Sequence, residues 1–254
     1  MNKYSLSKRL GMVADMIEVS DCHADIGCDH GFMALYLMNN NRINKAICTD
    51  INAGPLERAK EHIEKDGYSD KIKTILTDGL HNIDESYPHI TSATICGMGG
   101  LMGVKILFDR EDLFKKMEHF YLQLQSDLNL VRMYLEIAGY DIEEENVTKE
   151  EGKYYTAMKV KPYKEGLKFT SLDELVEYLK KEVNILSIEE AVKYYYPFYE
   201  SMDKEAYEDF LNFMIDKYEK VIGQMKEDSN NYSEVYRELE IMKKARGIFE
   251  GKAC

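Results

Sequence analysis

The sequence has no long apolar run. No stretch approaches the roughly 20 consecutive apolar residues that a membrane-spanning helix needs, and the opening MNKYSLSKRL lacks the hydrophobic core of a secretion signal. We therefore expect a cytoplasmic protein with no membrane partner. The 254 residues, 44% hydrophobic and 31% charged, have the composition of a globular chain.

The sequence also lacks the cysteine spacings of a metal site. Its five cysteines include no C-x-x-C pair, and no histidines accompany them at zinc-binding spacing. Three of them lie in or beside apolar segments, which is typical of reduced thiols in a reducing compartment. We therefore predict no metal.

Positive charge is scarce. The formal net charge is −13, from 33 Lys and Arg against 46 Asp and Glu. Such a chain does not coat nucleic acid indiscriminately, because nonspecific binding depends on neutralising many phosphates. A local basic patch that grips a folded RNA is still compatible with this composition.

Apolar segments of strand length alternate with helical patterns through residue 163. Because parallel strands need crossover connections, this alternation predicts an α/β fold with a mostly parallel, doubly wound sheet. A two-strand antiparallel ribbon over 140–163 would form its edge. The predicted parallel strands are 22–27, 45–51, 71–79, 91–100 and 120–127.

The pattern becomes almost entirely helical after about residue 164. Apolar residues recur every three or four positions in 207–225 and in 232–242, on either side of a polar turn. This spacing predicts an antiparallel α-helical hairpin of the coiled-coil type. We therefore divide the chain into a sheet domain, 1–163, and a helical coiled-coil domain, 164–254.

An acidic residue stands at the end of each of the first three predicted strands: Asp25, Asp50 and Asp78. Ligands of open parallel sheets bind at these strand ends. Asp50 comes 23 positions after Gly27 and 19 after Gly31, the usual placement of an acid that binds a ribose diol. A nucleoside cofactor is indicated. Each acid alone could simply cap a helix or turn, but three in order favour a cofactor site.

The first loop, DIGCDHG over 25–31, distinguishes between cofactors. A dinucleotide needs three close glycines so that its pyrophosphate can reach backbone amides, and this loop has two glycines and several acids. S-adenosylmethionine has no phosphate and carries two cationic groups that suit acids. We predict this cofactor and a class I, Rossmann-like methyltransferase fold. The predicted cofactor-binding residues are Asp25, Gly27, Cys28, Gly31, Asp50, Ile51, Asn52, Asp78, Gly79 and Gly97.

The fourth predicted strand ends in the glycine cluster GMGG, residues 97–100. One interpretation is a tight turn from strand to helix. Another is that bare backbone lets a flat substrate come close to the methyl group, with backbone groups bonding the edge of a base. The two interpretations are compatible, and both stay open at this point.

Together these motifs resemble the bacterial tRNA (adenine-N1)-methyltransferases that act on adenine 22 of tRNA. The similarity runs over roughly residues 3–163 and more loosely through the tail, where that family has a coiled-coil hairpin. This chain departs from the family at Cys28, usually serine, and at Ser126, usually proline, and it contains no tryptophan. The motifs that carry the resemblance are LSKRLGMVADMI, ADIGCDHG, CTDIN, TDGL, ICGMGG, LQLQ and EEENVTKEEGKYY.

The resemblance implies methyl transfer from S-adenosylmethionine to N1 of an adenine in tRNA. That nitrogen needs no strong base, because its lone pair already points outward. Methylation makes the base positive, so a carboxylate or carbonyl near the exocyclic amine and good alignment would help. His30 could equally be a helix-N-terminal residue bonded to backbone. The candidate catalytic residues are Asp29, His30, Gly97 and Met98.

The resemblance also implies tRNA as the partner and leaves the oligomeric state open. A paired or stacked adenine must be flipped out at a cost of a few kcal/mol, which phosphate contacts elsewhere would offset. Taken alone, the basic residues fit an ordinary solvated surface. The candidate RNA-binding residues are Lys3, Lys8 and Arg9 on the first helix and Lys243, Lys244 and Arg246 near the end.

Other functions stay open as alternatives. A catalytically idle RNA- or protein-binding module could keep this fold, although the three strand-end acids argue against it. A methyltransferase with a different nucleic-acid target is a second alternative. A nicotinamide oxidoreductase is disfavoured by the missing third glycine and by the absence of a basic residue in sequence near the first loop.

Overall fold

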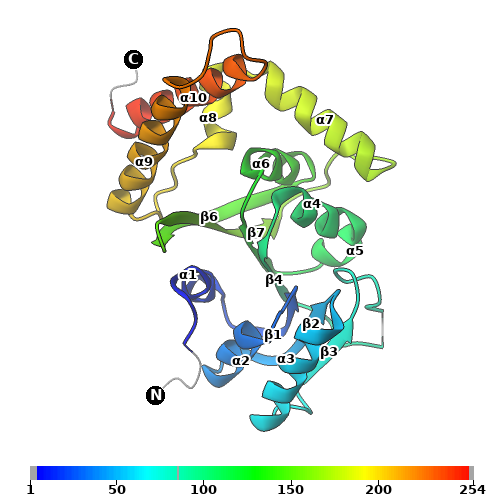
Figure 1. The fold of residues 1–254 in the computed structure, drawn as a ribbon. Coiled ribbons are helices and arrows are strands. Elements are labelled where there is room, and N and C mark those ends of the chain that lie inside the picture. Colours follow the sequence, from blue (N-terminus) through cyan, green and yellow to red (C-terminus); the bar gives the residue numbers. More distant parts are fainter. Residues whose placement is uncertain (1–4, 85, 252–254) are drawn as a thin grey trace.

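A seven-stranded sheet forms the centre of the computed structural model, which describes residues 5–84 and 86–251. The strand order is β3-β2-β1-β4-β5-β7-β6, with β1 to β5 parallel and the last two antiparallel. The predicted α/β sheet with its edge ribbon is confirmed (Figure 1). The strands are β1 (Ser20–Ile26), β2 (Ile43–Asp50), β3 (Ile72–Leu76), β4 (Ser92–Met98), β5 (His119–Leu124), β6 (Tyr140–Glu150) and β7 (Lys153–Pro162).

Helices cover both faces of this sheet, each face with its own apolar cluster. On one face lie α1 (Lys8–Met16), α2 (Phe32–Asn39) and α3 (Ala53–Lys65). On the other lie α4 (Gly100–Asp109), α5 (Glu111–Phe114) and α6 (Leu128–Ile137). The crossovers leave β1 and β4 adjacent at the centre, where the direction of winding reverses. Ligands of doubly wound sheets bind at the carboxyl ends of the strands at such a reversal.

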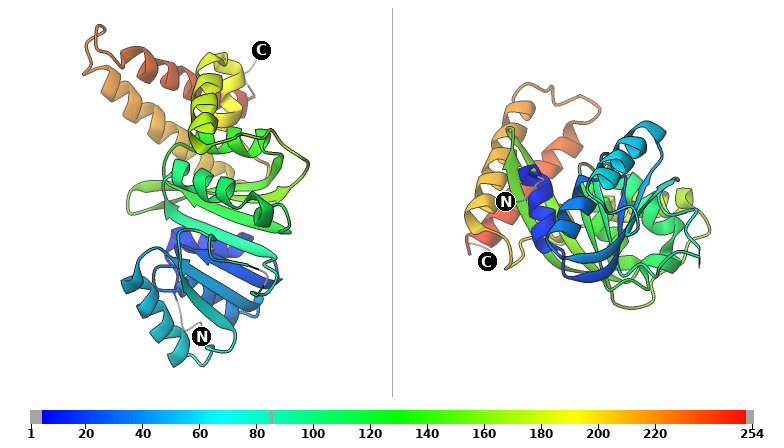
Figure 2. Two further views of the ribbon diagram at one scale, coloured as in Figure 1. Left: turned by 90° about the vertical axis from the view of Figure 1, so that its right-hand side faces the viewer. Right: turned by 90° about the horizontal axis from the view of Figure 1, so that it is seen from below.

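Four helices follow the sheet: α7 (Leu172–Ile185), α8 (Ile188–Tyr195), α9 (Lys204–Ile222) and α10 (Tyr232–Phe249). The last two form a hairpin that projects at the upper end of the left view in Figure 2. They bury apolar residues together with α8, as a bundle rather than as an isolated pair. None of the helices within residues 5–84 and 86–251 is long and apolar enough to cross a bilayer.

The helical part is packed against the sheet rather than tethered to it. Leu175, Leu179 and Val183 of α7 belong to the same apolar cluster as the sheet and α6. Val147 of β6 belongs to the cluster of α9 and α10. The division at residue 163 and the coiled-coil geometry of the hairpin stay predictions.

A buried ion pair ties the two parts together. Arg132 of α6 donates from Nε to Glu145 Oε2 on β6 at 3.0 Å and from Nη2 to the other carboxylate oxygen. Its Nη1 donates to the backbone carbonyls of Tyr194, at 2.6 Å, and Tyr195, at 3.2 Å, at the end of α8. Arg132 is 5% exposed and Glu145 1%. The guanidinium therefore joins a helix, a strand and the end of the next helical layer.

Removing this guanidinium should destabilise the protein strongly. We expect Arg132→Ala to lower the free energy of unfolding by about 3–5 kcal/mol, because Glu145 is left as a buried unpaired charge. The matched control is Lys193→Ala, whose ion pair with Glu136 is 56% exposed on both sides and should contribute about 1 kcal/mol or less. Urea unfolding measures both, and similar losses would contradict the structural role of Arg132.

Candidate functional site

The ends of β1 and β2 are joined by backbone and carboxylate hydrogen bonds. Gly27 and Cys28 each donate a backbone N–H to the Thr49 carbonyl, at 2.8 and 2.9 Å. The Asp29 N–H donates to Asp50 Oδ2 at 3.2 Å. Residues predicted from two separate strand ends therefore form one continuous surface.

Asp50 is the centre of this junction. It is only 8% exposed, and its Oδ1 accepts a second backbone hydrogen bond, from Asn52 at 2.8 Å. Asn52 occupies the N-cap of α3 but its side chain makes no capping bond, so Asp50 rather than Asn52 orders the start of that helix. Each carboxylate oxygen can accept another donor. Beside it, Ile51 is 66% exposed and presents an apolar face at the site.

Two glycines open the backbone at the ends of β1 and β4. Gly27 has φ +70° and Gly97 has φ +78°, conformations that favour glycine. A Cβ on Gly27 would lie 2.9 Å from Met98 Cε, and one on Gly97 would lie 3.2 Å from Arg9 Nη1. The structure thus brings together Gly27, Gly97 and Met98, as predicted, and adds Arg9 to them.

Asp25 lies beneath these glycines and is 5% exposed. Its Oδ1 accepts from Thr94 Oγ1 at 3.1 Å, while Oδ2 has no hydrogen-bond partner among the residues described. Burial raises the pKa of Asp25 to about 6, a shift that the Thr94 side chain and the Ala34 backbone amide oppose. A buried carboxylate oxygen without a donor is costly, and a cationic or hydrogen-donating ligand would satisfy it.

A line of buried polar groups leads to Asp25. His23 Nε2 lies 3.0 Å from Thr94 Oγ1, and its Nδ1 lies 2.8 Å from Ser92 Oγ, which contacts Ser20 Oγ at 2.7 Å. Burial lowers the pKa of His23 to about 3, so the ring is neutral. Thr94 spends its only hydrogen on the carboxylate and must accept from His23 Nε2–H. The carboxylate therefore fixes the direction of every hydrogen bond in the line.

Asp29 and His30 form the outer wall of the loop. The Asp29 carboxylate is 68% exposed, and its Oδ1 lies 3.5 Å from His30 Nε2. His30 Nδ1 accepts a hydrogen bond from Arg58 Nε of α3 at 3.1 Å, so the ring proton is on Nε2, facing Asp29. The partner of the His30 ring is thus a side chain, that of Arg58.

Helix α3 brings two residues to this wall that the sequence did not single out. Arg58 places a cation beside the first loop. No basic residue lies near this loop in sequence, but in the folded protein one reaches it from α3. His62 donates from Nδ1 to the His30 carbonyl at 3.1 Å, and its ring stacks on Phe32 at 5.1 Å. No local pattern marks Arg58 or His62, because α3 follows the next strand.

Asp78, which follows the end of β3, forms an ion pair with a lysine of α4. Lys105 of α4 donates to Asp78 Oδ2 at 2.8 Å and to Asp109 at 2.7 Å. The Asp78 side chain is 41% exposed, so one oxygen is paired and the other is available. Gly79 follows with φ +57° against Ile106, and Gly31, at the start of α2, has φ +71° against Ala59.

Arg9 belongs to the strand-end site rather than to a separate surface. Its Nη1 donates to Gln123 Oε1 of β5 at 2.6 Å, and its guanidinium lies over the Tyr155 ring, 5.4 Å from the centroid. Lys8 points elsewhere, with Nζ 3.5 Å from the Lys149 carbonyl of the ribbon. Lys3, the third predicted residue of this helix, lies outside the described residues.

The three basic residues near the end of the chain lie on α10 and are occupied by partners. Lys243 pairs with Glu219 at 3.1 Å, Lys244 with Glu189 at 3.4 Å, and Arg246 donates to the Asn212 side chain at 3.3 Å. The structure does not bring them to the strand-end site. Their role in RNA binding stays a prediction.

Comparison with known proteins identifies the family of this chain. A family model described as a methyltransferase domain matches residues 6–158. The chain belongs to this family. It is similar to the tRNA (adenine(22)-N(1))-methyltransferase of Bacillus subtilis strain 168, at 34% identity over 158 residues, 62% of this chain and 66% of that protein. The aligned region therefore spans about two thirds of that relative.

Two solved structures of TrmK proteins have the same fold as this chain. M. capricolum TrmK in complex with S-adenosyl-homocysteine is 25% identical, with a TM-score of 0.74 over 97% of this chain and 100% of that one. The B. subtilis m1A22 tRNA methyltransferase TrmK is 27% identical, with a TM-score of 0.66 over 95% and 98%. The predicted resemblance is confirmed, and this methyltransferase-domain protein is TrmK-like.

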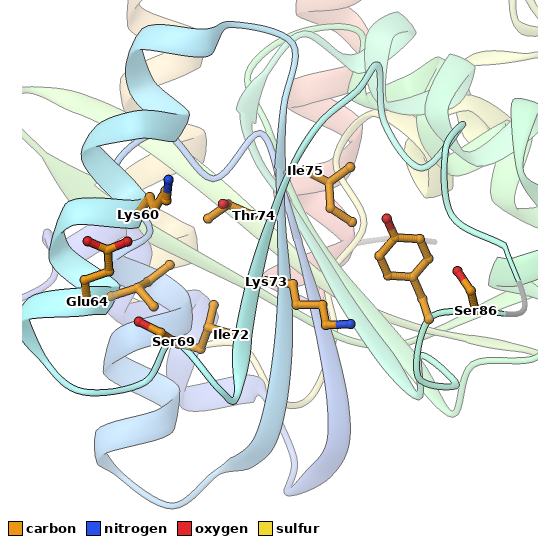
Figure 3. Close-up of a pocket in the computed structure, with 10 residues that line it drawn as sticks. Lys60, Glu64, Ser69, Ile72, Lys73, Thr74, Ile75 and Ser86 are labelled. Carbon is orange, nitrogen blue, oxygen red and sulfur yellow. The ribbon is translucent and has the colours of Figure 1, made fainter.

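A second hollow lies apart from this site. Its volume is about 400 Å³, and it straddles the outer edge strand β3 (Figure 3). Lys60 and Glu64 of α3 line one side and Ser86 the other. Tyr87 also lines the hollow. It contains none of the predicted site residues, so we do not assign it to the cofactor.

The hydrogen bond from Thr94 should stabilise the methyltransferase domain when Asp25 is ionised. We expect Thr94→Val to lower the free energy of unfolding at pH 7.5 by about 2–3 kcal/mol, because it leaves a buried carboxylate oxygen and His23 Nε2–H unpaired. Thr49→Val is the matched control. Both threonines are 0% exposed, but Thr49 Oγ1 has no described partner, so this change should cost less than about 1 kcal/mol. Equal losses in urea unfolding would contradict the role of the buried line.

Proposed function

We propose that this protein transfers a methyl group from S-adenosylmethionine to N1 of adenine 22 in tRNA, and that it does so in the cytoplasm. The observation that carries the proposal is the pair of buried acids, Asp25 and Asp50, at adjacent strand ends of a TrmK-like methyltransferase domain. Asp25 Oδ2 has no donor among the described residues. Such a site suits a cationic, phosphate-free nucleoside.

The residues present fit this cofactor. Asp50 has oxygens available for a ribose diol, and Asp25 Oδ2 has a vacant acceptor position for an ammonium group. Gly27 has no side chain to stand between the loop and a ligand, and exposed Ile51 offers an apolar face to adenine. The free oxygen of Asp78 would accept from the adenine amino group. When bound, the cofactor supplies an electrophilic methyl group on a sulfonium.

The chain's own residues would orient the target base and stabilise its charge. In the transfer the adenine N1 lone pair forms the new N–CH₃ bond while the C–S bond breaks, and the base becomes a cation. The exposed carboxylate of Asp29 would accept from the exocyclic amine as that charge develops. His30 Nε2–H holds the Asp29 carboxylate on one side. Gly97 and Met98 would form the floor on which N1 aligns with the methyl group.

The partner would be a tRNA, gripped by cations around this edge. Arg9 lies beside Gly97 and can meet the backbone of an extruded nucleotide. Another candidate is Lys8. The remaining candidates, farther from the strand-end site, are Lys243, Lys244 and Arg246 of α10. Lys243 and Lys244 now pair with the surface acids Glu219 and Glu189, and such pairs contribute little to stability, so phosphates could replace those acids.

A methylation assay tests the proposed function directly. Unmodified tRNA transcript and labelled S-adenosylmethionine should give 1-methyladenosine at position 22, and a transcript with guanine at that position should give none. Asp29→Asn should lower kcat by about 10²-fold or more, because it removes the charge that offsets the cationic base, while cofactor affinity measured by calorimetry stays unchanged. Cofactor binding without any methylation would instead favour a catalytically idle module.

Cofactor affinity should depend on the protonation of Asp25. Its pKa of about 6 in the free protein means that the carboxyl is charged at pH 7.5 and largely neutral at pH 5. A bound ammonium group favours the charged form, so the cofactor dissociation constant should rise about tenfold between these two pH values. Calorimetry at each pH measures the change. Asp25→Asn should bind weakly with no such slope, and an unchanged slope in that variant would show that another group titrates.

A further inference from the structure

A large cavity separates the ribbon from the terminal helices. Its volume is about 920 Å³, which is at the upper end of the range for small-molecule sites. The end of β5, the start of β7, α6, α7, α9 and α10 all contribute residues to its walls. We call it the aromatic cavity, because seven aromatic side chains line it: Tyr154, Tyr155, Tyr195, Tyr196, Phe210, Phe213 and Tyr218.

The aromatic cavity adjoins the strand end where the target base would be methylated. Tyr155 lines the cavity and also lies under the Arg9 guanidinium, which in turn stands beside Gly97. Gln125, another lining residue, donates its backbone N–H to the Met98 carbonyl at 2.9 Å. An RNA strand whose target base entered the site at Gly97 could continue directly into this cavity.

The outer wall offers aromatic faces to a planar ligand. The Tyr154 ring packs against Phe213, with centroids 5.1 Å apart, and against Phe210 at 5.4 Å. Phe213 is nonetheless 39% exposed, although it is a large apolar residue on a helix that buries its other face. Nucleic-acid bases stack on such rings without regard to sequence.

Three exposed lysines line the aromatic cavity of this acidic protein. Lys153, Lys180 and Lys217 line it and are exposed, and none of them forms an ion pair with a residue that the structure describes. The charge of Arg132 is already matched by Glu145. The remaining lining has three lysines and three acids, whereas the whole chain carries −13. Lysines without an acidic partner beside aromatic rings suit phosphates attached to bases.

We propose that the aromatic cavity binds one or two unpaired nucleotides that flank the methylated adenine, with a base stacked on Phe213 and phosphates at Lys153, Lys180 and Lys217. This inference rests on the proposed function, because RNA is the occupant. It adds a subsite that holds the strand after the target base has left the stack. The energy of stacking here would offset part of the cost of flipping.

Two pairs of variants test the subsite. Phe213→Ala and Lys217→Ala alter the cavity, and Tyr236→Ala and Lys220→Ala are their controls, since both control residues lie on the same hairpin outside the lining. We expect Phe213→Ala to raise the tRNA dissociation constant roughly 5- to 100-fold, as for the loss of one base–aromatic stack. Lys217→Ala should reduce the salt dependence of binding. The controls and the S-adenosylhomocysteine affinity of every variant should match the wild type.

Phe213→Leu guards against a purely structural effect. It keeps an apolar side chain against Tyr154, so this variant should have the wild-type melting temperature. Because it removes the flat ring, it should bind tRNA more weakly than the wild type does, as Phe213→Ala should. A tRNA with 2-aminopurine beside position 22 adds a direct signal. Its fluorescence should be quenched by the wild type and by Tyr236→Ala but not by Phe213→Leu.

The outcomes separate this inference from the proposed function. If the wild type methylates adenine 22 but the cavity variants bind tRNA and quench like their controls, the subsite is wrong and the function stands. If tRNA binding depends on Phe213 but no 1-methyladenosine forms, the function is wrong and the subsite stands. Binding of a protein partner instead of RNA, lost in Phe213→Ala, would also overturn the proposal.

Discussion

One carboxylate, that of Asp50, holds the site together. It accepts a backbone hydrogen bond from the loop after β1, through Asp29, and another from the start of α3, through Asn52. The same two oxygens face the position where a ribose would bind. Because the group that would bind the cofactor also shapes the loop that covers it, the Asp29–His30 wall is fixed before any ligand arrives. Preorganisation of this kind avoids an ordering cost on binding.

Asp25, the second acid of the site, is held by burial rather than by a set of backbone hydrogen bonds. Asp50 is satisfied by backbone amides, but Asp25 lies deep enough for burial to raise its pKa to about 6. The line from Ser20 through His23 to Thr94 supplies one donor and leaves Oδ2 open. A neutral histidine can orient such a line without adding charge. The result is a carboxylate that is charged at neutral pH and has one oxygen, Oδ2, without a hydrogen-bond partner among the described residues, which favours the capture of a cation.

Much of this arrangement could be predicted from the sequence because it is local. Strand ends follow from apolar periodicity, and acids or glycines just past them must meet at one edge of a parallel sheet. Asp25, Gly27, Asp50 and Gly97 were found in this way. The partners of these residues could not be, since they depend on register and packing. His23 meets Thr94 because β1 and β4 pair side by side, and Arg58 reaches His30 from the following crossover helix.

The basic residues show the same limit of prediction from sequence. Charge and helical periodicity placed Lys8 and Arg9 on one exposed helix face, yet their environments differ. Arg9 extends across β5 to Gln123 and Tyr155, whereas Lys8 lies against the ribbon. Only the path of α1 over β5, β7 and β6 separates them. Three-dimensional packing therefore places Arg9, a residue predicted for phosphate binding, beside Gly97 at the strand-end site.

The buried ion pair between α6 and β6 connects the catalytic edge with the terminal helices. Arg132 lines the aromatic cavity and binds the carbonyl of Tyr195, which lines it too. Its partner Glu145 lies on the strand paired with β7, which carries Tyr154 and Tyr155. Opposite walls of the cavity are thus fixed to one guanidinium. A buried pair of this kind adds less to stability than a well-packed apolar core would, so its value to the protein lies in setting the distance between those walls.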